Sequence, residues 1–288
     1  MERRQFLISA LVGGSCLCPA HRALAADSAV MQRSSGPLAD INASTGCMVT
    51  EKDFARDKLA QLGSGEHPTS TFVAGNQRYQ VGASSGNRAF DRALAEALYH
   101  LSKTFDVLPT FGFIKGENVA NAFATTALFK PENGDDNLPT REDGTVLFGN
   151  GIVDLMQRKG VSNIVGSVLA VCAHEFGHIV QYRYNYNDKP LISILNDDQP
   201  TVKRAELHAD FLAGYYIGVA KKRNPDTPAA SVAHAARVLG DMDVNNRSHH
   251  GTPEERGAAV YAGFQHSFEH NKPFAEASVD GLRYVKAI

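Results

Sequence analysis

Residues 165–180 read VGSVLAVCAHEFGHIV and are the most informative stretch of the sequence. Most of these side chains are apolar, which is typical of a helix buried in a protein core. His174, Glu175 and His178 interrupt the apolar pattern. Burying three polar side chains without a partner costs free energy, so we expect them to share a ligand. The stretch therefore predicts a central buried helix with one ligand-binding face.

The two histidines have the spacing of metal ligands. Residues four apart on a helix lie on the same face, so the imidazoles of His174 and His178 can bind one metal ion. Glu175 is placed to take a proton from water on the open side of that ion and to pass it on later. This is the chemistry of zinc hydrolases. Because the short pattern also arises by chance, the surrounding sequence must support it.

A third ligand is expected from a later helix, since catalytic zinc takes three protein ligands and keeps one position open. Residues 206–210 read ELHAD, so Glu206 and Asp210 share a helix face and His208 points away from it. We expect Glu206 to complete the metal site. Asp210 is expected to accept a hydrogen bond from the free ring nitrogen of a ligand histidine. The sequence thus predicts one Zn²⁺ ion per chain.

The two motifs together resemble those of a known group of enzymes. His-Glu-x-x-His followed by Glu-x-x-x-Asp is similar to the gluzincin pattern of thermolysin-like and CAAX-prenyl-type peptidases. The chain most resembles the bacterial neutral zinc metallopeptidases, which also carry a later His-Gly-[Ser/Thr]-x-x-x-Arg segment, here His250 to Arg256. Residues 121–124, Asn-Ala-Phe-Ala, resemble the strand ahead of the zinc helix in CAAX-prenyl-type enzymes. The resemblance covers residues 120–265 and implies an active site between the two motif helices.

The resemblance also implies a hydrogen-bond donor opposite the base. Gluzincins commonly use a His or Tyr there to stabilise the oxyanion of the tetrahedral intermediate. His250 is the candidate and His249 the alternate, while a surface-loop position for both stays open. Tyr182, Tyr184 and Tyr186 are expected to be packing or rim residues.

The rest of the sequence predicts a single α+β domain over residues 51–288. We expect a small sheet ahead of the zinc helix and a mainly helical C-terminal half. Apolar residues recur at helical spacing from Arg88, and loops around one short strand are expected in residues 63–86. Thr252 and Glu255 have the spacing of a capping box. Strands are expected at 71–73, 107–114, 121–129 and 145–148, and further helices at 201–223, from 227 and from 252.

The amino-terminal residues 1–25 have the three sections of an export signal. Arg3 and Arg4 precede an uncharged stretch, residues 5–20, and the small-residue sequence Ala23-Leu24-Ala25 closes the segment. Arg-Arg-x-Phe-Leu resembles the bacterial twin-arginine signal for folded proteins. Glu2 departs from that signal, which keeps the general secretory route open. The apolar stretch is too short to cross a bilayer, so no stable membrane anchor is expected. Residues 26–50 are expected to form a loosely ordered lead-in, and the mature protein to be periplasmic or secreted.

Composition and motifs exclude several other functions. The 288 residues carry a formal net charge of −2, which offers no electrostatic footprint for nucleic acid. The chain has no phosphate-binding loop, and the Gly-x-Ser-x-Gly match at Ser84 lacks an apolar strand before it. Cys47 and Cys172 are the only cysteines beyond the signal; a bond between them is left open, and Cys172 is not expected to be a nucleophile.

We therefore expect a zinc-dependent metallopeptidase that hydrolyses peptide or protein substrates with water activated by Glu175. One alternative is a peptidase-like protein that keeps zinc for structure and has no turnover. Glu175 argues against it, because structural zinc needs no base. The other alternative is a zinc hydrolase of a non-peptide amide. The sequence does not define the oligomeric state.

Overall fold

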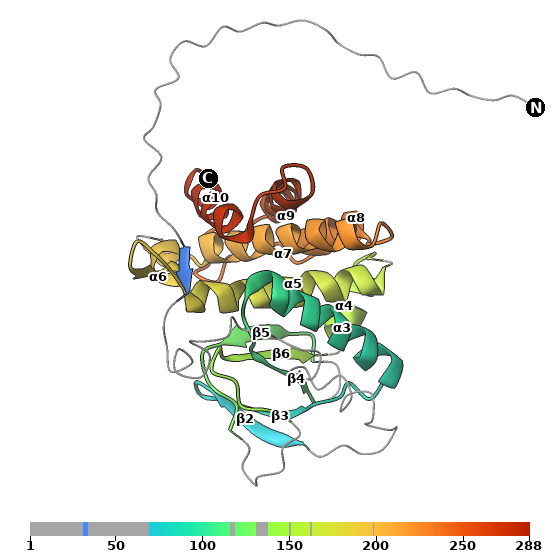
Figure 1. Cartoon of the computed structure of the whole chain (residues 1–288). Coiled ribbons are helices and arrows are strands. Elements are labelled where there is room, and N and C mark those ends of the chain that lie inside the picture. The colour runs from blue at the N-terminus through green and yellow to red at the C-terminus, as the bar shows by residue number, and fades with distance from the viewer. Residues whose placement is uncertain are drawn as a thin grey trace, which may run out of the picture.

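The structure, a computed structural model, describes residues 31–33, 69–115, 119–130, 138–149, 151–161, 163–197 and 199–288. The predicted export signal, Cys47 and most of the predicted lead-in lie outside these residues. The described chain is a mixed α+β fold, as the sequence predicts, with helices stacked on a five-stranded sheet (Figure 1). No helix in this part of the chain is long and apolar enough to cross a membrane.

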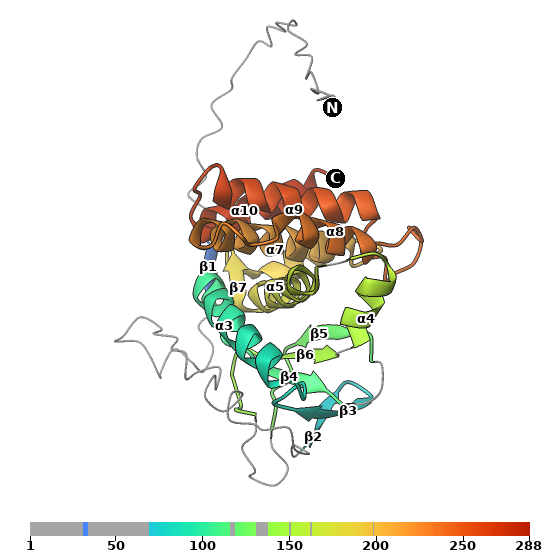
Figure 2. The same ribbon diagram turned by 90° about the vertical axis from the view of Figure 1, so that its right-hand side faces the viewer.

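The five-stranded sheet precedes α5 (Ile164–Arg183) in the sequence and lies below it in space (Figures 1 and 2). Its strands are β2 (Ser70–Ala74), β3 (Gln77–Gly82), β4 (Thr110–Ile114), β5 (Ala122–Thr125) and β6 (Thr145–Gly149). The order is β2-β3-β4-β6-β5. β4 and β6 are parallel, and all other neighbours are antiparallel. β6 is buried along its whole length, whereas β5 lies at the edge of the sheet.

The expectation of a single short strand within residues 63–86 is wrong. β2 and β3 form an antiparallel hairpin whose turn contains Gly75 with a φ of +58°. β3 reads QRYQVG, and only its last two residues, Val81 and Gly82, are buried. A strand with most of its side chains in water lacks the apolar alternation by which strands are recognised in a sequence. Its pairing with β2 and β4 therefore had no clear sequence signal.

Eight helices lie in the part of the chain that the structure describes. The sequence predicts five of them, α3, α5, α7, α8 and α9, with starts within a few residues of the observed ones. α9 begins with the capping box predicted for Thr252 and Glu255. Three short or C-terminal helices, α4, α6 and α10, were not expected. The helices are α3 (Arg88–Phe105), α4 (Gly151–Arg158), α5 (Ile164–Arg183), α6 (Leu191–Asn196), α7 (Lys203–Arg223), α8 (Ala229–Val238), α9 (Pro253–Phe268) and α10 (Phe274–Lys286).

α5 is the central helix, between the sheet and the layer formed by α7, α8, α9 and α10 (Figure 1). Its first turn is capped by Asn163, whose side chain accepts a hydrogen bond of 2.8 Å from the Gly166 N–H. α5 and α7 approach closely at Gly177, where an added Cβ would lie 3.0 Å from the Cα of Ala209. This close approach brings the two motif helices together beside the predicted metal ligands.

A second, small sheet ties the start of the described chain to the end of α5. It has the order β1-β7-β8, with β1 (Met31–Arg33), β7 (Tyr184–Tyr186) and β8 (Lys189–Pro190). Met31 is buried, and the guanidinium of Arg33 donates hydrogen bonds of 2.9 and 2.7 Å to the buried carboxylate of Asp143. Residues 31–33, which fall within the predicted lead-in, are therefore part of the folded body.

Candidate metal centre

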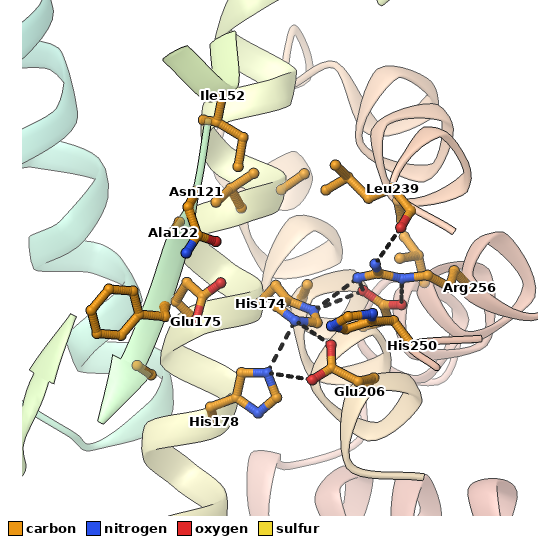
Figure 3. A pocket seen from close by; sticks show the side chains of 18 of the residues that line it. Asn121, Ala122, Ile152, His174, Glu175, His178, Glu206, Leu239, His250 and Arg256 are labelled. Carbon is orange, nitrogen blue, oxygen red and sulfur yellow. Dashed lines mark hydrogen bonds and ion pairs between the residues drawn. The ribbon is translucent and has the colours of Figure 1, made fainter. Parts of the chain in front are cut away.

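α5 and α7 bring the three predicted metal ligands together. The Nε2 atom of His174 lies 3.1 Å from Nε2 of His178 and 3.2 Å from a carboxylate oxygen of Glu206. The other carboxylate oxygen of Glu206 lies 3.4 Å from Nε2 of His178. All three ligand atoms are within 4.8 Å of one another (Figure 3). The His174, His178 and Glu206 group could therefore hold a metal ion.

The chemistry of these atoms fits a cation. Burial alone would lower the pKa of His174, but the charges and hydrogen bonds of Asp210 and Glu206 outweigh it and raise this pKa to about 10. Burial would raise the pKa of Glu206, and the neighbouring histidines and Arg256 instead hold it well below its usual range. The cluster thus favours a positive charge between its ligand atoms, which a proton or a metal ion can supply.

Asp210 contacts the ligand histidine, as its spacing predicts. Its Oδ1 atom accepts a hydrogen bond of 2.8 Å from Nδ1 of His174, which leaves Nε2 to face the metal position. Asp210 is itself held by Arg256, whose Nε and Nη2 donate bonds of 2.7 and 2.9 Å to the carboxylate. Burial would raise the pKa of Asp210, but Arg256 and His174 outweigh it and lower this pKa. Arg256 also donates to the Leu239 carbonyl at 3.1 Å, which connects the network to the end of α8.

Sequence reasoning did not identify the role of Arg256. It lies 46 residues from Asp210 in the chain, so no local spacing joins the two. Its place at the end of the His-Gly-Thr-x-x-x-Arg segment was the one available signal. Gln181, which contacts Nδ1 of His178 at 3.0 Å, was likewise missed.

Glu175 lies in the same pocket as the three ligand residues. Figure 3 shows it on α5, with its side chain on the side of β5. Its side chain is buried, and this burial raises the pKa of the carboxyl group although His174 and His178 act to lower it. A carboxylate with raised pKa is a better proton acceptor near neutral pH than an exposed one. Glu175 is therefore a buried carboxyl group with a raised pKa in the same pocket as the ligand group.

The pocket has a volume of about 420 Å³ and extends from His174, His178 and Glu206 along α5 toward the N-terminus of this helix. Residues 120–124, which include most of β5, form one wall. The end away from the metal cluster is apolar. Its walls come from α4, α5 and α8, with Ile152, Leu155, Ala170, Val171, Val232 and Ala236.

His250 lies on the wall of this pocket, whereas His249 does not line it. The side chain of His250 is 46% exposed, and that of His249 is 3% exposed. Asp241 holds both residues: its carboxylate accepts from the His250 N–H at 3.0 Å and contacts Nδ1 of His249 at 2.5 Å. Of the two predicted oxyanion donors, only His250 is therefore placed to reach a bound substrate (Figure 3).

The other residues considered in the sequence are not members of the ligand group. His208 is buried and contacts the Ser278 carbonyl through Nε2 at 3.1 Å. Ser84 is buried and donates a hydrogen bond of 2.6 Å to Asp91, which fixes the start of α3. Cys172 is a free, buried thiol whose pKa is raised by burial, so it has little nucleophilic character. Tyr182 lies on the pocket wall, which agrees with the packing or rim position expected for it.

The chain matches no protein-family model, no curated protein and no solved structure at a significant level of similarity. The likeness to gluzincins depends on the motifs alone and stays a prediction.

Proposed function

We propose that this protein is a zinc-dependent metallopeptidase of gluzincin type. The observation that carries the proposal is the convergence of His174, His178 and Glu206 in a pocket that also contains the buried carboxylate of Glu175. Metal binding alone would explain the first three residues. The additional buried carboxylate, in the same pocket but outside the ligand group, is what a hydrolase needs.

Zinc is the metal that suits this set of ligands. Two imidazoles and one carboxylate form the His₂Glu set of catalytic zinc sites, which leaves a position for water or substrate. When bound, zinc polarises the substrate carbonyl and lowers the pKa of water. His174, His178 and Glu206 would hold it.

The residues of the chain account for the proton transfers of peptide hydrolysis. Glu175 takes the proton of the attacking water and then delivers it to the nitrogen of the leaving amine. A ring N–H of His250 donates a hydrogen bond to the oxyanion that develops on the attacked carbonyl. Asp241 fixes the loop that presents His250 through its bond to the His250 N–H at 3.0 Å. Water attack and amine departure thus share a single acid–base group.

The shape of the pocket suits an extended peptide. Among the described strands, β5 pairs with β6 alone, so its other edge is available to a substrate main chain along the pocket. The apolar end of the pocket can take an apolar side chain of the substrate. These two features favour a peptide over a small amide of the second alternative.

The proposal is tested with Glu175→Gln, which removes the proton acceptor and keeps the size of the side chain. We expect turnover of a casein substrate to fall by roughly 10²- to 10⁴-fold while zinc content and thermal stability stay at the wild-type level. A chelator should abolish the wild-type activity, and added zinc should restore it. The matched control is Glu254→Gln, because Glu254 is an exposed residue of α9 outside the pocket.

Three outcomes would contradict the proposal. Near-normal activity of Glu175→Gln would place the base elsewhere. Zinc retention by a wild-type protein that cleaves no peptide would favour a binding protein or a hydrolase of another amide. Full zinc occupancy in His178→Ala would contradict the ligand assignment itself.

A further inference from the structure

The second metal-binding histidine is held by a chain of neutral hydrogen bonds. Nδ1 of His178 lies 3.0 Å from Oε1 of Gln181, one turn further along α5. The Gln181 side chain is fully buried, and its Nε2 atom donates to the Ala205 carbonyl at 2.7 Å. The same Nε2 atom lies 3.3 Å from Nδ1 of the buried His208. This series of hydrogen bonds ends on α10, where the Ser278 carbonyl lies 3.1 Å from Nε2 of His208.

The Ala205 carbonyl determines which atom is the donor in the hydrogen bonds of Gln181. A carbonyl oxygen accepts hydrogen bonds and never donates them, so the amide atom that faces it must be the NH₂ group of Gln181. The other amide atom, Oε1, is then an acceptor and requires an N–H on Nδ1 of His178. The neutral imidazole of His178 consequently has its lone pair on Nε2, the atom that faces Glu206 and His174.

His208 continues this pattern of donors and acceptors to the C-terminal helix α10. Its Nε2 atom faces the Ser278 carbonyl and must donate. Nδ1 of a neutral His208 is then free to accept from Gln181. Donors and acceptors therefore alternate without conflict from α10 to His178. All of the side chains between the two ends are fully buried, so water does not compete for these bonds.

We propose that Gln181 and His208 are positioning residues of the metal site, which hold His178 with Nδ1 protonated and Nε2 directed at the metal. The proposal rests on the metal site of the proposed function and concerns the histidine that Asp210 does not contact. His174 is oriented by a charged pair, Asp210 with Arg256, and His178 by a neutral amide and imidazole. α10 thereby contributes to metal binding although it supplies no ligand.

The test measures metal binding directly, apart from activity. In Gln181→Leu, which keeps the approximate volume, we expect zinc affinity to fall by roughly 10- to 100-fold, the usual cost of losing the partner of a ligand histidine. The visible absorption spectrum of the cobalt-substituted protein should shift, because the His178 ring is free to turn. Zinc affinity is measured by competition with a chelator, and folding by circular dichroism.

Two further variants and a control separate positioning from packing. His208→Phe keeps an aromatic ring but removes both hydrogen bonds, and should weaken zinc binding. His208→Gln keeps one acceptor and one donor, and should restore most of the affinity. The control is Ser278→Ala. His208 contacts the backbone carbonyl of Ser278, which this variant keeps, and the Ser278 hydroxyl has no partner among the described residues.

Unchanged zinc affinity and cobalt spectrum in folded Gln181→Leu would overturn the proposal, provided that His178→Ala loses zinc. If Gln181→Leu does not fold, equal affinities of His208→Phe and His208→Gln would overturn it instead. Failure of the metal site itself has a different signature, because His178→Ala would then keep its zinc.

Discussion

The predicted site residues and their supporting partners differ in how far apart they lie in the sequence. His174, Glu175 and His178 lie within one helical turn, and Glu206 and Asp210 are four apart on the next motif helix. The helical period therefore predicts which of them share a face. Arg256 reaches Asp210 from another helix, so this contact depends on how α7 and α9 pack. Gln181 lies three residues after His178 on α5, but the direction of its amide depends on the Ala205 carbonyl of α7. For this reason the ligands could be predicted from the sequence and the residues that orient them, apart from Asp210, could not.

Asp210 is expected to matter for both metal affinity and stability. In Asp210→Ala, His174 loses the acceptor at its Nδ1 atom, so zinc affinity should fall by roughly 10- to 100-fold. The same change leaves the buried guanidinium of Arg256 without its carboxylate, which should cost about 3–5 kcal/mol of unfolding free energy. Chelator competition and urea unfolding measure the two effects. The control is Asp226→Ala, an exposed residue. Unchanged affinity and stability would show that Asp210 does not support the site.

Asp241 should make stability depend on acid pH. Its partial burial acts to raise its pKa, but the hydrogen bonds from the His250 N–H and His249 outweigh this and lower the pKa to about 2. An unfolded Asp has a pKa of about 3.9. Because the folded value is the lower one, Asp241 stabilises the fold above about pH 4, and this stabilisation is lost as the pH falls toward 2.

The difference in unfolding free energy between wild type and Asp241→Asn reports this contribution. We expect the difference to be constant above about pH 5 and to shrink below about pH 4, in urea unfolding at several pH values. If the difference in unfolding free energy stayed constant down to low pH, Asp241 would not be the cause of the lower stability in acid.

Among the helices and strands, the sequence best predicts the helices with a full cap or a long apolar pattern. α9 has a full capping box, and α5 and α7 are long and largely buried. The missed elements lack these features: α4 has 8 residues, and β3 has only two buried positions. Sequence patterns thus predict α5 and α7, the helices that carry the candidate metal ligands. Short elements such as α4 and β3 form only through their contacts with the rest of the fold.

The crossing of α5 and α7 should be sensitive to one methyl group. In Gly177→Ala the new Cβ would lie 3.0 Å from the Cα and 3.2 Å from the carbonyl oxygen of Ala209. These backbone atoms can move away only if the whole helix α7 shifts. We expect a loss of about 1–3 kcal/mol in unfolding free energy, although alanine favours a helix over glycine. Zinc affinity should fall as well, because Glu206 and Asp210 move with α7 relative to the two histidines.

The matched control for this crossing is Gly257→Ala in α9. There the three atoms nearest to the new Cβ all belong to the side chain of Arg237, with Cγ at 2.6 Å. This side chain is 47% exposed and can move away, unlike the backbone of Ala209. We expect this variant to keep wild-type zinc affinity and stability in thermal unfolding with and without zinc. Equal behaviour of Gly177→Ala and Gly257→Ala would contradict a tight crossing at Gly177.

For the whole molecule, the α+β prediction is confirmed, and the position of β1 limits where the predicted export signal could be cleaved. Met31 is buried and Arg33 donates to the buried Asp143, so the folded body begins at or before Met31. Removing β1 would leave Asp143 without one of its two arginine partners. Cleavage near Ala26, which the small-residue close of the signal predicts, keeps this strand in the mature protein.

We expect the protein to be exported after it has folded and bound its metal. A route for folded proteins would let the cytoplasm supply the metal before export. Replacing Arg3 and Arg4 together by Lys keeps the charge and should leave the precursor inside the cell, because the twin-arginine signal requires arginine. The control is Arg22→Lys, in the same segment but outside the pair. Immunoblots of cytoplasmic and periplasmic fractions, with mass spectrometry of the mature terminus, make the measurement. Normal export of the double variant would indicate the general secretory route, and an uncleaved cytoplasmic wild type would contradict export altogether.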